Sequence, residues 1–299
     1  MTNAIETRKL VWAYQKQKVL NGIDLQVPKG AIYGYLGRNG AGKTSTIKLL
    51  MGLLPAKRNS VYFEGKEFVA NREQILQKVG SLIGDPAYYN LSAKENLQVL
   101  DDIYHCGKRR IMEMLEITGL ADDKDKKVPK FSTGMKQRLG IAMALLHDPD
   151  VIILDEPMNG LDPEGIYEIR ELLLKLKEVG KTIFFSSHIL DEMEKICTHV
   201  GILERGQLIY QGTLTALLKD VPKQVTVLCE SPETVCSLFT GQQFDAYVEQ
   251  SNKVSVRLNQ SQSFGDFIRL LAKADTTVYN IESNNSSLEN IYLNLTSNV

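Results

Sequence analysis

A glycine-rich segment near the amino terminus contains residue types that can bind phosphate. It reads Gly37-Arg38-Asn39-Gly40-Ala41-Gly42-Lys43-Thr44, after the apolar run 31–36 and before the helix-like segment 45–54. In this setting, backbone N–H groups and the positive end of a helix dipole surround phosphate oxygens, while Lys43 reaches the β and γ phosphates and Thr44 holds Mg²⁺. The segment therefore predicts a nucleoside triphosphate site. The residues expected to line it are Asn39, Gly40, Ala41, Gly42, Lys43, Thr44 and Ser45.

Two adjacent carboxylates follow a second apolar run, residues 151–154. Asp155 can hold Mg²⁺ directly or through water, and Glu156 can polarise a water for in-line attack on the γ-phosphate. A pair of solvated turn residues is the plain alternative. Together with the glycine-rich segment, the pair predicts hydrolysis of the bound triphosphate.

A second candidate anion site lies shortly before that run. Ser132-Thr133-Gly134 precedes a helix-like segment that starts at Met135. The Ser132 hydroxyl, the free N–H groups and the end of the helix dipole can together hold an anion. Taken alone, such a tripeptide is more often a simple helix N-cap. Its place just before the acidic strand favours anion binding.

The segments around these residues predict an α/β domain. Short strand-like segments between residues 11 and 36, broken at Asn21-Gly22 and at 28–30, predict an antiparallel layer. The apolar runs 151–154 and 182–185 predict buried parallel strands with chemistry at their carboxyl ends. Between these runs, apolar residues at helical spacing predict a helix that ends near Gly180.

The glycine-rich segment and the acidic pair are too far apart for one strand–helix–strand unit. Lys43 and Asp155 are 112 positions apart (155 − 43), whereas such a unit needs only about 30 residues. The intervening sequence is rich in helix signals, including a possible cap from Ser92 to Glu95. We expect a helical subdomain over about residues 85–146.

The last part of the chain has a different pattern. Strand-like alternation around 225–229, 244–248, 254–258 and 278–281, with helix-like segments after Ser231 and at 267–272, gives the order β-α-β-β-α-β. Ser286 and Glu289 predict a capping box for a final helix. We therefore expect a nucleotide-binding domain over residues 1–219 and a small accessory α+β domain over 220–299.

Composition limits the class of protein. The chain has 299 residues, 43% of them hydrophobic, and a net charge of -1, which argues against a dedicated nucleic-acid binder. Its four cysteines lack C-x-x-C spacing and its start lacks a secretory pattern, which favours a reducing cytosol. No apolar stretch approaches the ~18 to 20 residues that cross a bilayer, so we expect any membrane role to need a separate subunit.

The motifs together resemble those of ABC-transporter ATP-binding subunits. Over residues 10–212 they follow the family's order: the phosphate loop, the signature at 131–135, Walker B at 151–156, the D-loop at 160–163 and the switch His188. The resemblance implies a P-loop NTPase fold with an antiparallel β-subdomain and a helical subdomain. It also implies that ATP and Mg²⁺ bind between the phosphate loop of one chain and the signature of another, in a head-to-tail dimer.

The resemblance also assigns roles to single residues. Tyr14 takes the place of the aromatic that stacks on adenine, although Trp12 is nearby. His188 is expected to contact the γ-phosphate and sense its loss, and Glu156 and His188 are the expected catalytic residues. The remaining nucleotide contacts come from the signature and the D-loop, at Ser132, Gly134 and Asp162.

The expected partners also follow from the resemblance. They are a second copy or a paralogous ATPase chain, and an integral-membrane transporter subunit that holds the pair at the cytoplasmic face of the membrane. No nucleic-acid partner is expected.

Two departures from the family pattern stand out. In the signature, Thr133 and Met135 replace two of the usual residues. Gly84 falls where the family carries a metal-contacting Gln, and a glycine has no side chain with which to coordinate. The neighbouring Asp85 is a candidate substitute, either as a Mg²⁺ or water contact or in coupling to the membrane subunit. An ordinary turn before Pro86 is the alternative.

Within the family, the signature style S-x-G-M-K-Q-R-L is most similar to bacitracin-resistance and lantibiotic-immunity ATPases. That similarity implies export of, or immunity to, an antimicrobial peptide or drug. A non-transport ABC ATPase of translation or DNA repair is the alternative, but those proteins usually carry two cassettes or long coiled coils. A P-loop kinase or GTPase would leave the signature, the D-loop and His188 unexplained.

Overall fold

The computed structural model describes residues 2–15, 17–85, 87–219, 223–242, 244–250, 252–259, 262–284 and 287–297. The chain forms two compact units, Met1–Leu214 and Thr215–Asn298. The domain limit expected at residue 219 coincides with the end of helix α8 (Leu214–Lys219), just beyond the division between the units.

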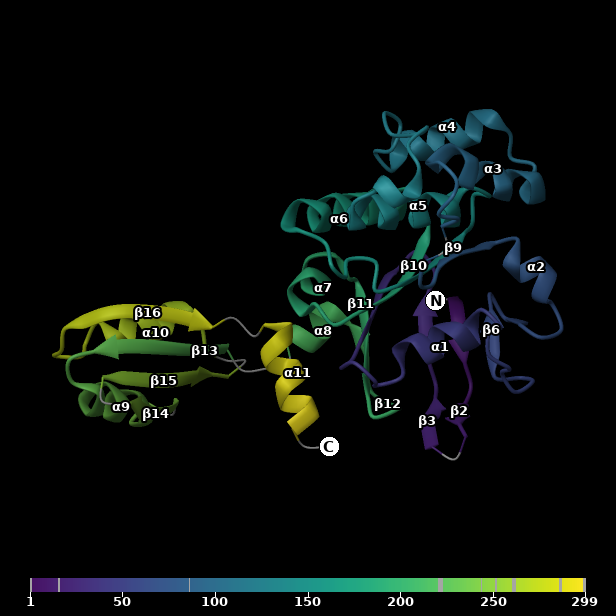
Figure 1. Cartoon of the computed structure of the whole chain (residues 1–299). Coiled ribbons are helices and arrows are strands. Elements are labelled where there is room, and N and C mark those ends of the chain that lie inside the picture. Colours follow the sequence, from purple (N-terminus) through teal and green to yellow (C-terminus); the bar gives the residue numbers. More distant parts are fainter. Residues whose placement is uncertain are drawn as a thin grey trace. The chain divides into compact units, whose positions relative to one another are not determined.

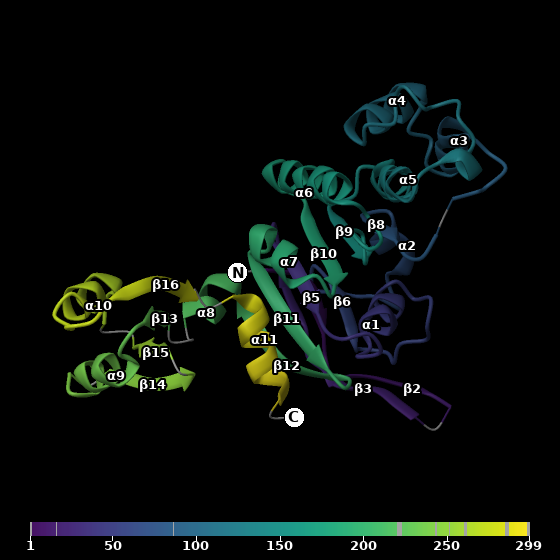
Figure 2. The ribbon, with the colours of Figure 1, turned by 60° about the vertical axis from the view of Figure 1, so that its left-hand side comes forward.

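A six-stranded sheet in the order β12-β11-β5-β10-β9-β8 forms the centre of the first unit (Figure 2). Five strands are parallel, and β12 (Gln207–Thr213) runs antiparallel to β11. The parallel strands are β5 (Ile32–Leu36), β8 (Val79–Leu82), β9 (Val151–Asp155), β10 (Thr182–Ser187) and β11 (His199–Glu204). Because their carboxyl ends meet at one edge, the segments that follow β5, β9 and β10 can form one site.

Antiparallel strands precede the glycine-rich loop, as expected, but two short strands after the loop, at 61–63 and 66–67, also join this layer. One sheet has the order β4-β1-β6-β7, and β2 pairs with β3. The strands are β1 (Asn3–Thr7), β2 (Leu10–Tyr14), β3 (Gln17–Ile23), β4 (Gln26–Pro28), β6 (Val61–Phe63) and β7 (Lys66–Glu67). Residues 32–36, expected in this layer, belong instead to the parallel sheet as β5.

The expected break at Asn21-Gly22 is wrong, because both residues lie inside β3. Leu10 pairs with Ile23, but Val11 pairs with Asn21, so Gly22 is the extra residue of a β-bulge. Its φ of +78° is easily adopted by glycine. The Asn21-Gly22 pair, which is typical of a hairpin turn, therefore forms a β-bulge within a strand of this protein.

Helices α3 (Ala93–Tyr104), α4 (Lys108–Ile117) and α5 (Thr133–Leu145) gather into the helical part of the first unit (Figure 1). The expected capping box is present: the Ser92 hydroxyl accepts from the Glu95 N–H at 3.2 Å, and the Ser92 N–H donates to the Glu95 carboxylate at 2.7 Å. The other elements are α1 (Lys43–Leu50), α2 (Arg72–Leu76), η1 (Val128–Lys130), α6 (Pro163–Glu178) and α7 (Leu190–Ile196).

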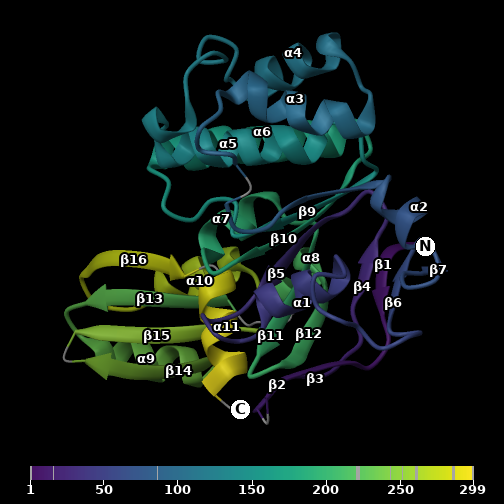
Figure 3. The same cartoon turned by 45° about the vertical axis from the view of Figure 1, so that its right-hand side comes forward.

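The second unit has the expected order β-α-β-β-α-β and an antiparallel sheet β14-β15-β13-β16 (Figure 3). Alternate valines of the central strands pack against stacked Phe239 and Phe267 from α9 and α10. This is the sheet order of a ferredoxin-like fold. Its elements are β13 (Lys223–Cys229), α9 (Pro232–Thr240), β14 (Asp245–Gln250), β15 (Lys253–Leu258), α10 (Phe264–Leu271), β16 (Val278–Asn284) and α11 (Leu288–Ser297).

Two helix starts in this unit differ from the sequence expectation. α10 begins three residues before the expected residue 267, because Ser263 and Asp266 form a capping box there. The expected cap residue of α11, Ser286, lies outside the described residues. The Ser287 hydroxyl accepts from the Asn290 N–H at 3.3 Å at the start of that helix.

Candidate nucleotide site

The loop between β5 and α1 is shaped by glycines. Gly40 and Gly42 have φ values of +84° and +114°, which side chains disfavour. A Cβ on Gly42 would lie 2.6 Å from Leu20 Cδ2, so the buried Leu20 side chain would have to move. Gly42 precedes α1 without a side-chain cap, which leaves the N–H groups of the first turn to bind an anion.

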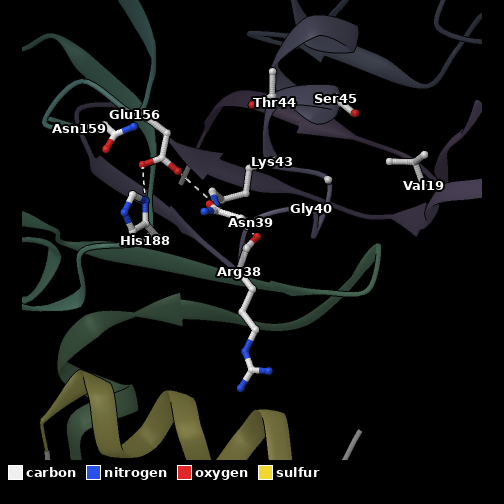
Figure 4. Close-up of a pocket in the computed structure, with 11 residues that line it drawn as sticks. Val19, Arg38, Asn39, Gly40, Lys43, Thr44, Ser45, Glu156, Asn159 and His188 are labelled. Carbon is white, nitrogen blue, oxygen red and sulfur yellow. Dashed lines mark hydrogen bonds and ion pairs between the residues drawn. The ribbon is translucent and has the colours of Figure 1, made fainter.

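Lys43 lies at the centre of the site, and its side chain is almost fully buried. Its Nζ donates to the Gly37 carbonyl at 2.6 Å and pairs with Glu156 Oε1 at 3.1 Å. The other carboxylate oxygen of Glu156 lies 2.9 Å from His188 Nδ1 (Figure 4). Residues from α1, the segment after β9 and the segment after β10 therefore meet.

A cavity of about 470 Å³ opens beside these residues. It is lined by Val19, Arg38, Asn39, Gly40, Gly42, Lys43, Thr44, Ser45, Glu156, Asn159 and His188. All the expected loop residues except Ala41 are present. Ala41 is buried, and its N–H donates to the Arg38 carbonyl at 3.1 Å.

Three lining residues were not expected from the sequence. Arg38 stands inside the loop motif, and Asn159 follows the acidic pair closely, so their positions were a usable signal. Val19 carries no such signal, because it reaches the cavity from β3 through tertiary packing.

Asp155 is positioned by a neighbouring strand. Its Oδ1 accepts a hydrogen bond from the Ser186 hydroxyl at 2.7 Å. Mg²⁺ takes oxygen ligands and commonly uses one or two carboxylates together with substrate phosphates. The oxygens of Asp155 and Thr44 match that preference. Among the described residues, no cluster of three or more His, Cys, Asp or Glu side chains could hold a metal by itself.

Besides Ala41 and the residues of the signature and D-loop, Tyr14, Asp85 and Asp155 do not line this cavity. Tyr14, at the end of β2, is 67% exposed. The carboxylate of Asp85 accepts from the Ala87 N–H at 3.3 Å and from the Tyr89 hydroxyl. The hydrogen bond to Asp85 raises the pKa of Tyr89. Asp85 is therefore engaged within its own segment.

The signature and the D-loop form a second cavity of about 450 Å³. The Ser132 hydroxyl accepts from the Met135 N–H at 3.2 Å, and Asp162 Oδ1 accepts from the Gly165 N–H at 3.0 Å, so each caps a helix. Met135 is buried and does not line the cavity. The lining residues are Ser132, Thr133, Gly134, Arg138, Gly160, Leu161, Asp162, Glu164, Gly165 and Glu168.

The two cavities share no lining residue. Within one chain, the structure therefore brings the signature to the D-loop but not to the phosphate loop.

The family model of the ABC transporter matches residues 20–159. The bacitracin transport ATP-binding protein BcrA of Bacillus licheniformis is 40% identical over 99% of this chain and 98% of its own length. The chain belongs to the ABC transporter ATP-binding proteins. The lantibiotic transport ATP-binding protein SrtF of Streptococcus pyogenes is 41% identical over 69% of this chain and 90% of its own length.

A solved structure of an ATP-binding subunit of an ABC transporter has a TM-score of 0.65 and 30% identity, and it covers 73% of this chain and 92% of that chain. This ABC subunit therefore binds and hydrolyses ATP. Subunits of the family dimerise and work with membrane subunits, and the relatives do not favour a role in translation or DNA repair. Within the part of the chain that the structure describes, no helix has the length and apolar character to span a membrane.

Proposed function

We propose that this chain drives export of, or immunity to, a peptide antibiotic of the bacitracin type, through a separate membrane subunit. The observation that carries the proposal is the extent of the similarity to BcrA, which covers 99% of this chain and hence both units. The similarity to SrtF, which covers 69%, makes a lantibiotic the second candidate.

In the proposed mechanism, the phosphate groups of ATP lie over the N-terminus of α1, against Lys43. Lys43 is a charge-assisted donor to the β and γ phosphates. Glu156 orients and deprotonates the attacking water, and His188, 2.9 Å from Glu156, contacts the γ-phosphate. Asp155 and Thr44 would hold Mg²⁺, which when bound neutralises charge on the phosphates. Tyr14 stacks on adenine.

The separation of the two cavities supports a head-to-tail pair of ATPase chains. A γ-phosphate held at Lys43 of one chain would meet the Ser132 hydroxyl and the N–H groups at the start of α5 of the other. These contacts are charge-assisted and disappear after hydrolysis, so ATP would close the pair and its cleavage would release it. The pair would lie at the cytoplasmic face, bound to the membrane subunit.

We also propose that residues 220–299 are an accessory domain with its own core. Buried Val225, Val227, Val254 and Val256 pack with Phe239 and Phe267, all within this unit. Subunits of the bacitracin type would share this domain, because the similarity to BcrA extends over 99% of this chain.

The transport proposal is tested by expressing the chain with its native membrane partner in a bacitracin-sensitive host. We expect the chain to co-purify with an integral-membrane protein, and we expect the inhibitory concentration of bacitracin to rise only when Glu156 is intact. A rise for a lantibiotic alone would favour the second candidate. Unchanged resistance to both, with no membrane protein bound, would contradict the proposal.

For Asp85 we propose a role in coupling, because its carboxylate binds Ala87 and Tyr89 rather than the cavity. We expect Asp85→Ala to lower resistance in cells while the ATPase rate of the purified chain stays close to that of the parent, because Asp85 does not line the nucleotide cavity. Asp122→Ala, an exposed acid in the same helical subdomain, serves as the control. Loss of ATPase activity in the purified chain would instead favour the metal or water contact.

A further inference from the structure

The hydroxyl of Ser186 lies between the two acidic residues of the Walker B segment. Ser186 is on β10, opposite Asp155 in the parallel register between β9 and β10, and it is fully buried. Its Oγ accepts from the Glu156 N–H at 2.9 Å and donates to Asp155 Oδ1 at 2.7 Å. One side-chain atom therefore contacts the backbone of one acid and the carboxylate of the other.

The hydrogen bond to Glu156 holds an unfavourable backbone conformation. Glu156 has a φ of +51°, in the left-handed region that residues other than glycine seldom adopt. This turn directly follows the end of β9 and directs the Glu156 carboxylate towards Lys43 Nζ and His188 Nδ1, at 3.1 and 2.9 Å. An acceptor for the Glu156 N–H stabilises that turn.

The hydrogen bond to Asp155 is compatible with the first one. A serine hydroxyl has one proton, so accepting from Glu156 leaves that proton free to point at Asp155. Two bonds in series through one hydroxyl polarise each other. The orientation of the Asp155 carboxylate is thereby linked to the backbone turn at Glu156.

We infer that Ser186 is a positioning residue of the ATPase reaction, which sets the metal-binding carboxylate and the general base at once. The inference rests on the roles proposed above for Asp155 and Glu156. Ser186 does not line the nucleotide cavity, so it acts only through these two residues. A partner that orients a metal ligand typically contributes 10–100-fold to metal affinity or activity.

The test variant is Ser186→Ala in the full chain, assayed for ATPase activity against Mg²⁺ concentration. We expect the Mg²⁺ concentration for half-maximal activity to rise by about tenfold or more and the maximal rate to fall by about tenfold. Binding of a fluorescent ATP analogue in EDTA should match the parent, because the phosphate loop is untouched. If Ser186→Ala does not fold, Ser186→Cys has nearly the same shape but a weak donor, and should shift the Mg²⁺ dependence in the same direction.

Thr182→Val is the matched control, because Thr182 is a buried hydroxyl on the same strand that accepts from the Gly30 N–H at 2.9 Å. We expect it to lose thermal stability without a change in Mg²⁺ dependence. Parent-like Mg²⁺ dependence and rate in Ser186→Ala, or an equal shift in Thr182→Val, would overturn the inference.

Asp155→Asn and Glu156→Gln are assayed alongside. Full activity in either would contradict the proposed roles of the acids. Their inactivity combined with a parent-like Ser186→Ala would overturn the role of Ser186 alone.

Discussion

Glu156→Gln should lower the ATPase rate by about 10² to 10⁴-fold while ATP remains bound. Glutamine keeps the shape of the side chain but cannot take a proton from water. The contacts of Lys43 and the loop with phosphate persist, so the closed pair of chains should accumulate. Light scattering after size exclusion, with and without ATP and Mg²⁺, measures the mass directly.

Asp150→Asn provides the matched control for Glu156→Gln. Asp150 precedes the opposite end of the same strand, β9, and its half-exposed side chain pairs with Lys78 at 3.6 Å. We expect parent-like turnover and no persistent dimer. A monomeric mass for Glu156→Gln with ATP bound would contradict the proposed pairing, and normal turnover would contradict its role as the base.

Lys43→Ala should abolish nucleotide binding at the ATP concentrations that saturate the parent chain. The Lys43 side chain is only 6% exposed, and its Nζ is fixed at 2.6 Å from the Gly37 carbonyl, so its charge is held in place before ATP arrives. Truncating one partner of a buried charge pair typically costs 2–5 kcal/mol, which corresponds to a loss of about 30-fold or more in affinity. Titration with a fluorescent ATP analogue gives the dissociation constant.

Lys48→Ala, in the last turn of the same helix, is the control: it tests whether the loss of any lysine from α1 weakens nucleotide binding. It does not line the nucleotide cavity, and we expect the dissociation constant to be unchanged. Retained affinity in Lys43→Ala would make the phosphate-loop assignment wrong.

The part of the site that the sequence predicts well is encoded locally. The loop residues are consecutive, and Glu156 and His188 each follow an apolar run that forms a buried parallel strand. Parallel strands place their carboxyl ends at one edge, so sequence order alone brings Lys43, Glu156 and His188 together. The 3.1 and 2.9 Å distances among them are consistent with that expectation.

The features that sequence reasoning missed depend on contacts between distant segments. Val19 reaches the cavity from β3, whose register is shifted by the bulge at Gly22. Ser186 contacts Asp155 because β10 and β9 are in register, 31 positions apart in the chain. The sequence of the short segment after β8 does not predict that the Tyr89 hydroxyl donates a hydrogen bond to the Asp85 carboxylate.

The claim that two chains share ATP can be tested by disulfide cross-linking. Asn39 lines the nucleotide cavity and Thr133 lines the signature cavity, so Asn39→Cys and Thr133→Cys place one thiol at each face. In the Glu156→Gln background, mild oxidation with ATP and Mg²⁺ should give a covalent dimer only when both cysteines are present, and little without nucleotide. A variant that binds ATP yet yields no dimer, or only an internal bridge, would contradict the account.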